Sequence, residues 1–282
     1  GNKKKTKQRG VAETCVRAAP FFYAAFICLA CAEPRQREGK KSESRARQAI
    51  NRFAQFSAIF LTGAAGGPIM VGMKILSPEF PSPLTRYENN APVLENFTEN
   101  AAFSACDFTR AALADAEFSH VKFSGCKFVS ADLRRADFCD AVFENCDFSG
   151  AILRGAALRR ARLEDCKGMG ADFSEGYFAD TVAGKCNFSY ANFGGTKFKA
   201  VRFANCNFSD SSLSGCTLKG FEIQAANLLR AELYGTLFKG VDLSDCALEG
   251  VTLSQDLREL RGATVSALHA AGFLRALGIH VR

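Results

Sequence analysis

Cysteine is the residue type whose spacing in this sequence could do the most chemistry. Seven of the twelve cysteines recur at intervals of twenty residues, with one gap: Cys106, Cys126, Cys146, Cys166, Cys186, Cys206 and Cys246. If twenty residues make one turn of a coil, these thiols form a column that could hold a metal or act as a redox ladder. Stacked residues lie about 4.8 Å apart with parallel Cβ vectors, however, which is farther than a disulfide favours. Because no histidine accompanies the column, we predict that it is small apolar core filling and assign it no metal or cofactor.

No arrangement typical of catalysis accompanies these thiols. The three histidines, His120, His269 and His280, are isolated in sequence, and no phosphate-binding loop or nucleophile motif has the right flanks. The carboxylates follow a regular outward pattern, so they lack the burial that tunes a pKa for acid–base work. We predict that the protein is not an enzyme and has no small-molecule substrate. An enzyme with an unrecognised site, near Gly168 and Ala183, is one alternative.

Basic side chains form a second pattern with the same spacing. Arg159, Lys199, Lys219 and Lys239 fall in one column with Lys197 beside it, and Arg134, Arg135, Arg154 and Arg160 are predicted to cluster at the adjoining corner. Like charges stacked this closely repel one another, so their presence indicates an acidic partner. The nine residues are our candidate partner-binding surface. The alternative is a solvated face whose charges are balanced by nearby carboxylates, among them Asp137, Asp140, Asp165 and Asp180.

A period of five residues indicates which elements position these side chains. Of the 31 positions spaced by five from Phe103 to Leu253, 29 hold Phe, Leu or Ile, and only Gly168 and Ala183 break the series. Two residues before each position, a second register holds mainly Ala and Cys. This period fits neither an α-helix nor a simple strand, but it fits stacked coils with four five-residue sides and the apolar pair inside. At Gly168 and Ala183 we expect a local void, filled by Met169 or Tyr177.

The pentads also resemble a known repeat family. Ala131-Asp132-Leu133-Arg134-Arg135 and Ala191-Asn192-Phe193 match the A-(D/N)-(L/F)-x-x motif of the pentapeptide repeat family, and the resemblance runs without insertion from about residue 101 to 255. It implies an all-β fold, a right-handed quadrilateral parallel β-helix of about eight coils. The resemblance says little of function, because known members include DNA-mimicking gyrase-protection proteins, thylakoid-lumen proteins of unclear role and domains of larger assemblies.

Composition divides the chain into four parts. We predict a targeting presequence or membrane-anchoring extension with hydrophobic helical segments at 1–76, a Pro-rich linker at 77–96, the β-helix at 97–255 and a C-terminal helical cap at 256–282. The N-terminal part holds two uncharged stretches, one of which is long enough to span a bilayer. Their layout resembles a multipart presequence for delivery to a plastid thylakoid lumen. The rival interpretation is a retained anchor in the thylakoid or another membrane.

These patterns favour a non-catalytic scaffold or protein-binding module. We expect a structural or assembly subunit that docks on a protein partner, with a membrane-associated and photosynthetic complex as the leading case and an anionic lipid surface as a second. A DNA mimic that binds a topoisomerase is the other alternative. Such a mimic needs a strongly acidic surface, whereas residues 97–255 carry 17 basic and 20 acidic side chains. Direct binding of nucleic acid is not expected either.

Overall fold

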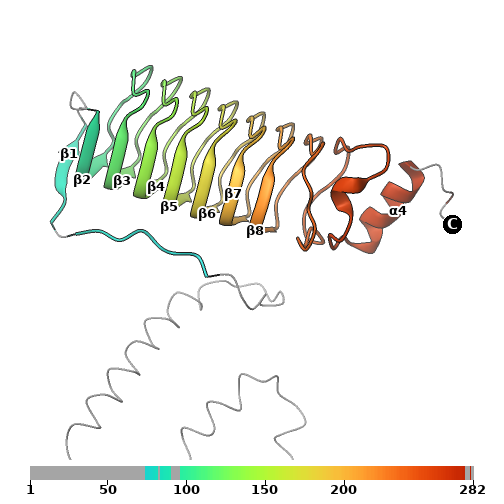
Figure 1. The fold of residues 1–282 in the computed structure, drawn as a ribbon. Coiled ribbons are helices and arrows are strands. Elements are labelled where there is room, and N and C mark those ends of the chain that lie inside the picture. The colour runs from blue at the N-terminus through green and yellow to red at the C-terminus, as the bar shows by residue number, and fades with distance from the viewer. Residues whose placement is uncertain (1–73, 82, 90–95, 277–279, 281–282) are drawn as a thin grey trace, which may run out of the picture. The chain divides into compact units, whose positions relative to one another are not determined.

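The computed structural model describes residues 74–81, 83–89, 96–276 and 280, which are built on one parallel sheet (Figure 1). Its eight strands are β1 (Thr85–Glu88), β2 (Phe97–Ser104), β3 (Glu117–Ser124), β4 (Asp137–Glu144), β5 (Ala157–Glu164), β6 (Tyr177–Gly184), β7 (Lys197–Ala204) and β8 (Thr217–Gln224). They lie side by side in sequence order, and from β2 onward each residue pairs with the one twenty positions later, as Phe103 does with Phe123. The strands therefore belong to successive turns of one coil.

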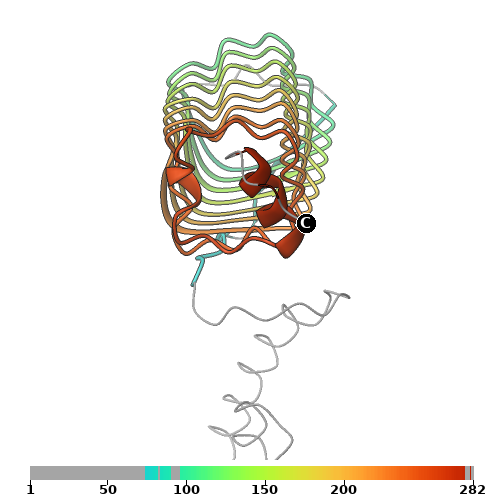
Figure 2. The same cartoon turned by 90° about the vertical axis from the view of Figure 1, so that its right-hand side faces the viewer.

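Each turn has four sides, as the view along the axis shows (Figure 2). An eight-residue strand makes two of them, with a bend at a left-handed residue such as His120, where φ is 53°. Ladders of single bridges, which begin with Asp107↔Lys127 and Ala112↔Asp132, hold the other two sides together. The predicted parallel β-helix of stacked pentads is confirmed.

Aromatic rings fill the inside of the coil in columns. Phe123 is fully buried and stacks between Phe103, with ring centroids 4.8 Å apart, and Phe143, at 5.2 Å. It also meets Phe128 edge-on at 5.2 Å and 78°. Aromatic pairs in these two geometries stabilise a core beyond the area they bury. The large-residue register therefore forms ring stacks along the axis, and the stack of Phe103, Phe123 and Phe143 ends where Leu163 takes the next position.

Asp or Asn follows the small residue of several pentads for a local reason. The side-chain oxygen of Asp107 accepts a hydrogen bond of 2.9 Å from the backbone N–H of Thr109, and Asn192 does the same for Gly194 at 2.9 Å. Such bonds stabilise a tight turn two residues further on. The corner residue that follows is left-handed, as at Arg110, where φ is 58°. At these pentads the outward Asp or Asn therefore stabilises the turn from one side to the next.

The structure corrects our expectation about the missing core side chain at residue 168. The ring of Phe188, one coil later, fills the space above Gly168, because a Cβ built on Gly168 would lie 2.8 Å from Cδ1 of Phe188. Met169 and Tyr177 stay at the surface, 50% and 36% exposed. A large ring can tilt into a neighbouring gap inside the core, whereas neither outward side chain can reach it without breaking a corner.

The segment before β2 lies against the coil. The backbone N–H of Glu79 donates to Oδ1 of Asp140 at 3.2 Å, and that of Leu76 donates to Oδ1 of Asp180 at 3.3 Å. β1 falls within the predicted linker 77–96, and it pairs with β2 as part of the sheet. The uncharged stretches of the predicted presequence or anchor lie outside the described residues, which begin at residue 74.

The C-terminal end of the coil is covered by non-repeat chain. A 3-10 helix, η1 (Arg258–Leu260), and a helix, α4 (Ala267–Ala276), follow the last pentad. The carbonyl oxygen of Glu259 accepts a 2.8 Å hydrogen bond from the N–H of Phe238, so the last coil is paired with the cap. Within the described ranges, no helix is long and apolar enough to cross a membrane.

Candidate partner-binding face

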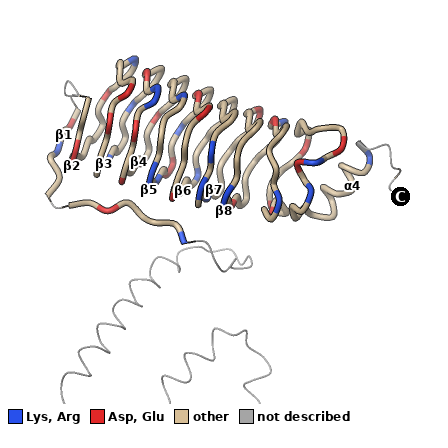
Figure 3. Tube along the Cα trace, in the orientation of Figure 1, with Lys and Arg blue, Asp and Glu red and all other residues tan. Residues whose placement is uncertain are grey.

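The strand register places the predicted basic column on one side of the sheet. Lys199 pairs with Lys219, and Ala179 stands between Arg159 and Lys199. Lys197 lies two residues before Lys199 on β7. Basic residues accordingly gather along the ends of β7 and β8 in Figure 3. We call the four exposed side chains Lys197, Lys199, Lys219 and Lys239 the lysine face.

Lysines and arginines of the predicted surface differ in their partners. All five arginines form ion pairs with carboxylates of this chain: Arg134 with Asp132, Arg135 with Asp115, Arg154 with Glu175, Arg159 with Asp137, and Arg160 with Asp140. Among the described residues, the lysines that form ion pairs are Lys122 and Lys185, neither of which belongs to the lysine face. The lysine face therefore carries the uncompensated part of the predicted charge.

Arg160 does not join the corner at which it was predicted. It lies on the opposite corner of the same side, where its Nε donates to Oδ1 of Asp140 at 2.7 Å. Burial would raise the pKa of Asp140, but the hydrogen bonds from Arg160 and from the N–H of Glu79 outweigh it and hold that pKa below its usual value. Cys139 is half-buried beside this pair, with its Sγ 3.0 Å from Nη2 of Arg160. This corner fastens the segment before β1.

Two exposed apolar residues extend the lysine face, and the charge pattern alone did not reveal them. Tyr177 pairs with Lys197 in the register and is 36% exposed. Leu237, twenty residues after Thr217, is 58% exposed. Aromatic side chains such as Tyr177 are enriched at protein–protein interfaces, so its exposure beside the lysines is consistent with a protein-binding patch. The sequence does hold a signal for both residues, because each is a large apolar residue in an outward position of its pentad, on a side where many of the other outward positions are charged.

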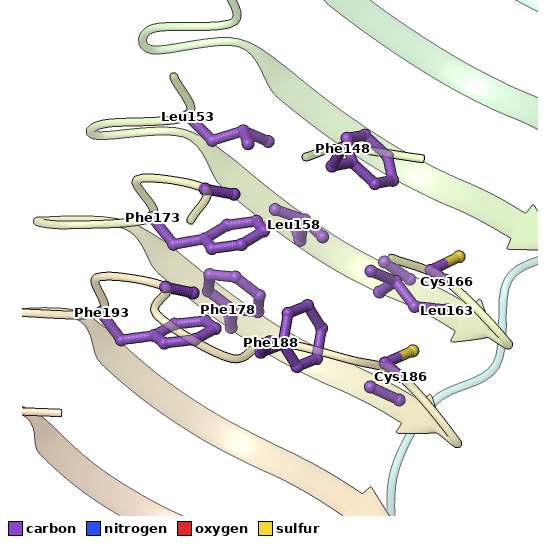
Figure 4. Close-up of a cluster of buried hydrophobic side chains, with 14 of the residues drawn as sticks. Phe148, Leu153, Leu158, Leu163, Cys166, Phe173, Phe178, Cys186, Phe188 and Phe193 are labelled. Carbon is purple, nitrogen blue, oxygen red and sulfur yellow. The ribbon is translucent and has the colours of Figure 1, made fainter. Parts of the chain in front are cut away.

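The cysteine column lies inside the coil, as the twenty-residue spacing predicts. Figure 4 shows Cys166 and Cys186 on successive coils at the edge of the apolar cluster. Among the described cysteines, Cys126, Cys139, Cys146, Cys166, Cys186, Cys206, Cys216 and Cys246 are free thiols. Burial raises the pKa of Cys216 to about 11 and that of Cys246 to about 12, so both are protonated at neutral pH. In this part of the chain, no three His, Cys, Asp or Glu residues come together as a metal site.

Stacked five-residue sides, an inward apolar pair and a turn at every fifth residue define a repeat solenoid of pentads. The chain belongs to the pentapeptide repeat family. A family model described as a pentapeptide repeat region matches residues 96–173, 136–207 and 160–233, and one described as pentapeptide repeats (8 copies) matches residues 223–255. No curated protein matches the sequence.

Several solved structures share the repeat. Full-length QnrB1, a plasmid-mediated fluoroquinolone resistance protein, is 22% identical over 69% of this chain and 100% of its own, with a TM-score of 0.35. HetL of the cyanobacterium Nostoc sp. strain PCC 7120, involved in heterocyst differentiation regulation, is 19% identical over 64% and 91%, with a TM-score of 0.25. A pentapeptide repeat protein of the Arabidopsis thaliana thylakoid lumen is 25% identical over 43% and 68%, with a TM-score of 0.13. Their differing roles assign none to this chain.

Proposed function

We propose that this protein is a non-catalytic scaffold or assembly subunit whose lysine face docks on an acidic protein. The observation that supports this most directly is the contrast between five arginines paired within the chain and four exposed lysines outside any ion pair of the described residues. Stacked lysines repel one another in the free protein. An acidic partner removes that repulsion. Association is then favoured, and no ion pair within the described residues has to break.

The partner we favour is a subunit of a membrane-associated complex in a plastid, in or beside the thylakoid lumen. This part of the proposal rests on residues 1–76, whose basic and apolar composition resembles a multipart presequence or an anchor. An anionic lipid surface would be attracted to the same four lysines, because the electrostatic attraction does not distinguish the source of negative charge. Tyr177 and Leu237 favour a protein, since they add apolar contacts beside the charges.

The test is recovery of partners from native cells that express the tagged full chain. In the first variant, Lys197, Lys199, Lys219 and Lys239 are each replaced by Gln. In a control with the same change of net charge, Lys122, Lys127, Lys167 and Lys185 are replaced. We expect an acidic protein to be recovered with the wild type and the control and to be lost from the first variant. Equal recovery of the acidic protein with all three chains would contradict the proposal. The three chains are also tested for binding to anionic vesicles, and if vesicle binding is the only binding that the first variant loses, the lysine face is assigned to lipid.

A further inference from the structure

The stacking of the coil is interrupted after β8. Every strand from β2 to β7 has a parallel neighbour on both sides, but β8 pairs with β7 alone. Within the described residues, no backbone hydrogen bond joins 217–224 to 237–244, the next turn along. The N–H of Gly240 instead donates to the carbonyl oxygen of Gly262 at 2.8 Å. One edge of β8 is thus left without a strand partner while the other two sides of the coil continue to pair, as at Asn227↔Ala247.

A change of corner and a change of side chain coincide with this break. The turn at 238–241 is closed by a 3.0 Å hydrogen bond from the N–H of Val241 to the carbonyl oxygen of Phe238. In β8 the corresponding corner, at Gly220 with φ of 59°, lies within the strand. In addition, Phe221 occupies the register that holds Val201 in the preceding coil. Its ring lies 5.4 Å from that of Phe198. A phenylalanine therefore stands beside the break in a register that holds a smaller residue one coil earlier.

The break opens a cavity of about 210 Å³ on the side that carries the lysine face. It is lined by Leu218, Gly220, Phe221, Glu222, Lys239, Gly240 and Val241. Leu218, Phe221 and Val241 supply apolar walls. The one carboxylate of the lining, Glu222, is neutralised by Arg202, whose Nε lies 2.6 Å from its Oε2. A cavity of roughly 150 Å³ is already large enough for a benzene ring, so this space accommodates an apolar side chain.

We propose that this cavity is a peptide site, in which an extended acidic segment of the partner adds to the open edge of β8 and inserts an apolar side chain between Leu218, Phe221 and Val241. An unpaired strand edge is a template for another strand, and backbone hydrogen bonds then supply affinity while pockets supply specificity. Lys219 and Lys239 flank the site and select acidic neighbours of the inserted residue. This inference rests on the proposed function, since it specifies how an acidic partner engages the lysine face.

The test uses the full chain and a set of fluorescein-labelled octapeptides in which Asp or Glu alternates with Val, Leu, Ile or Phe. Binding is followed by fluorescence anisotropy. Leu218→Asp places a negative charge in the cavity and is expected to weaken binding about tenfold or more. The matched control is Leu268→Asp, which adds the same charge at an exposed position of α4 outside the cavity lining and is expected to weaken binding less than about threefold.

A second arm does not depend on any variant folding. The tightest peptide is resynthesised with N-methyl groups on alternate residues, which removes backbone donors and leaves the side chains intact. Strand addition predicts that one of the two methylated registers loses binding about tenfold or more and the other keeps it. Equal binding of both registers, or no binding by any peptide of the set, would overturn the peptide site.

The two proposals fail in different ways. If Leu218→Asp and N-methylation leave binding unchanged while replacement of the four lysines by Gln abolishes it, the cavity is not the site and the lysine face still binds acidic chains. If the lysine replacements leave partner recovery from cells unchanged, the proposed function fails whatever the peptides do.

Discussion

The thiol of Cys126 donates a hydrogen bond to the backbone carbonyl oxygen of Phe103, 3.5 Å away in the preceding coil. The hydroxyl of Thr181 makes the equivalent bond to the carbonyl oxygen of Leu158 at 3.2 Å. Thiol and hydroxyl therefore have the same role in the small-residue register: each fills a small volume and ties one turn to the one before. This shared role gives a structural reason for the column of cysteines.

Removal of one member of this column should have a small effect on stability. Cys146→Ala deletes a buried sulfur and its bond to the carbonyl oxygen of Phe123, and we expect it to lower the free energy of unfolding by about 1 kcal/mol. Cys146→Ser keeps a donor and should cost less. Chemical denaturation measures both, with and without a chelator. A loss several times larger that appears only without chelator would show that the column holds a metal.

At residue 168 the core should be sensitive to added volume, not to lost volume as at Cys146. Gly168→Ala places a methyl group 2.8 Å from the ring of Phe188, and such overpacking costs about 1–3 kcal/mol. Adding Phe188→Leu should restore part of the loss, because the smaller side chain vacates that space. Gly272→Ala in α4, where nothing lies within 4 Å, serves as the control and should be neutral or stabilising. Thermal denaturation of the four chains decides the matter, and an unchanged midpoint for Gly168→Ala would contradict the packing described here.

The cysteine column and the gap at Gly168 differ in how far the sequence alone predicts them. The five-residue period determines which side chains face inward, since an apolar pair can be buried in one way only when coils stack. It therefore predicts the Phe columns and the buried cysteines from spacing. It does not predict which neighbour fills a gap, because Phe188 reaches Gly168 by tilting its ring, and rotations of that kind depend on all the surrounding side chains.

The corner at Asp140 should control the segment before β1. The side chain of Asp140 is 3% exposed and binds Arg160 and the N–H of Glu79. Asp140→Asn leaves Arg160 without its counter-charge, and we expect a loss of about 1–3 kcal/mol with faster tryptic cleavage after Lys74. Asp115→Asn breaks an exposed pair with Arg135 and should lower the stability much less. Unchanged proteolysis of Asp140→Asn would mean that other contacts hold the segment.

The cap predicts an acid-sensitive contribution to stability. Glu259 is fully buried and accepts hydrogen bonds from the hydroxyl of Ser254 at 2.6 Å and the N–H of Gly235 at 2.9 Å. Burial would raise its pKa, but these bonds outweigh it and lower the pKa to about 2 from 4.5. Because the folded pKa is the lower one, the stabilisation is complete above pH 4.5 and is lost as the pH falls towards 2.

Glu259→Gln isolates this contribution. The difference in unfolding free energy between wild type and variant should be roughly 3 kcal/mol at pH 7 and should shrink as the pH falls from 4.5 towards 2. Urea titrations at a series of pH values measure it. A difference that does not vary with pH would show that the Glu259 carboxylate contributes by packing alone.

The candidate site was predicted less completely than the fold. Twenty-residue spacing places Lys199 and Lys219 in one column, because the coil has that length. It does not reveal that the arginines are paired within the chain, since whether Arg160 reaches Asp140 or a partner depends on side-chain reach across a corner. The cavity beside β8 also escapes the pattern, although Phe221, a large residue in the small register, marks the position in the sequence.

The central claim is that the lysine face is covered by a partner in the cell, and lysine footprinting tests it without any substitution. An amine-reactive label is applied to the full chain in intact native fractions and to the purified chain, and modification is read by mass spectrometry. We predict that Lys197, Lys199, Lys219 and Lys239 are less reactive in the native fractions than in the purified chain. Lys127, Lys167 and Lys185 should react equally in both samples. Equal reactivity of all seven lysines in the two samples would contradict it.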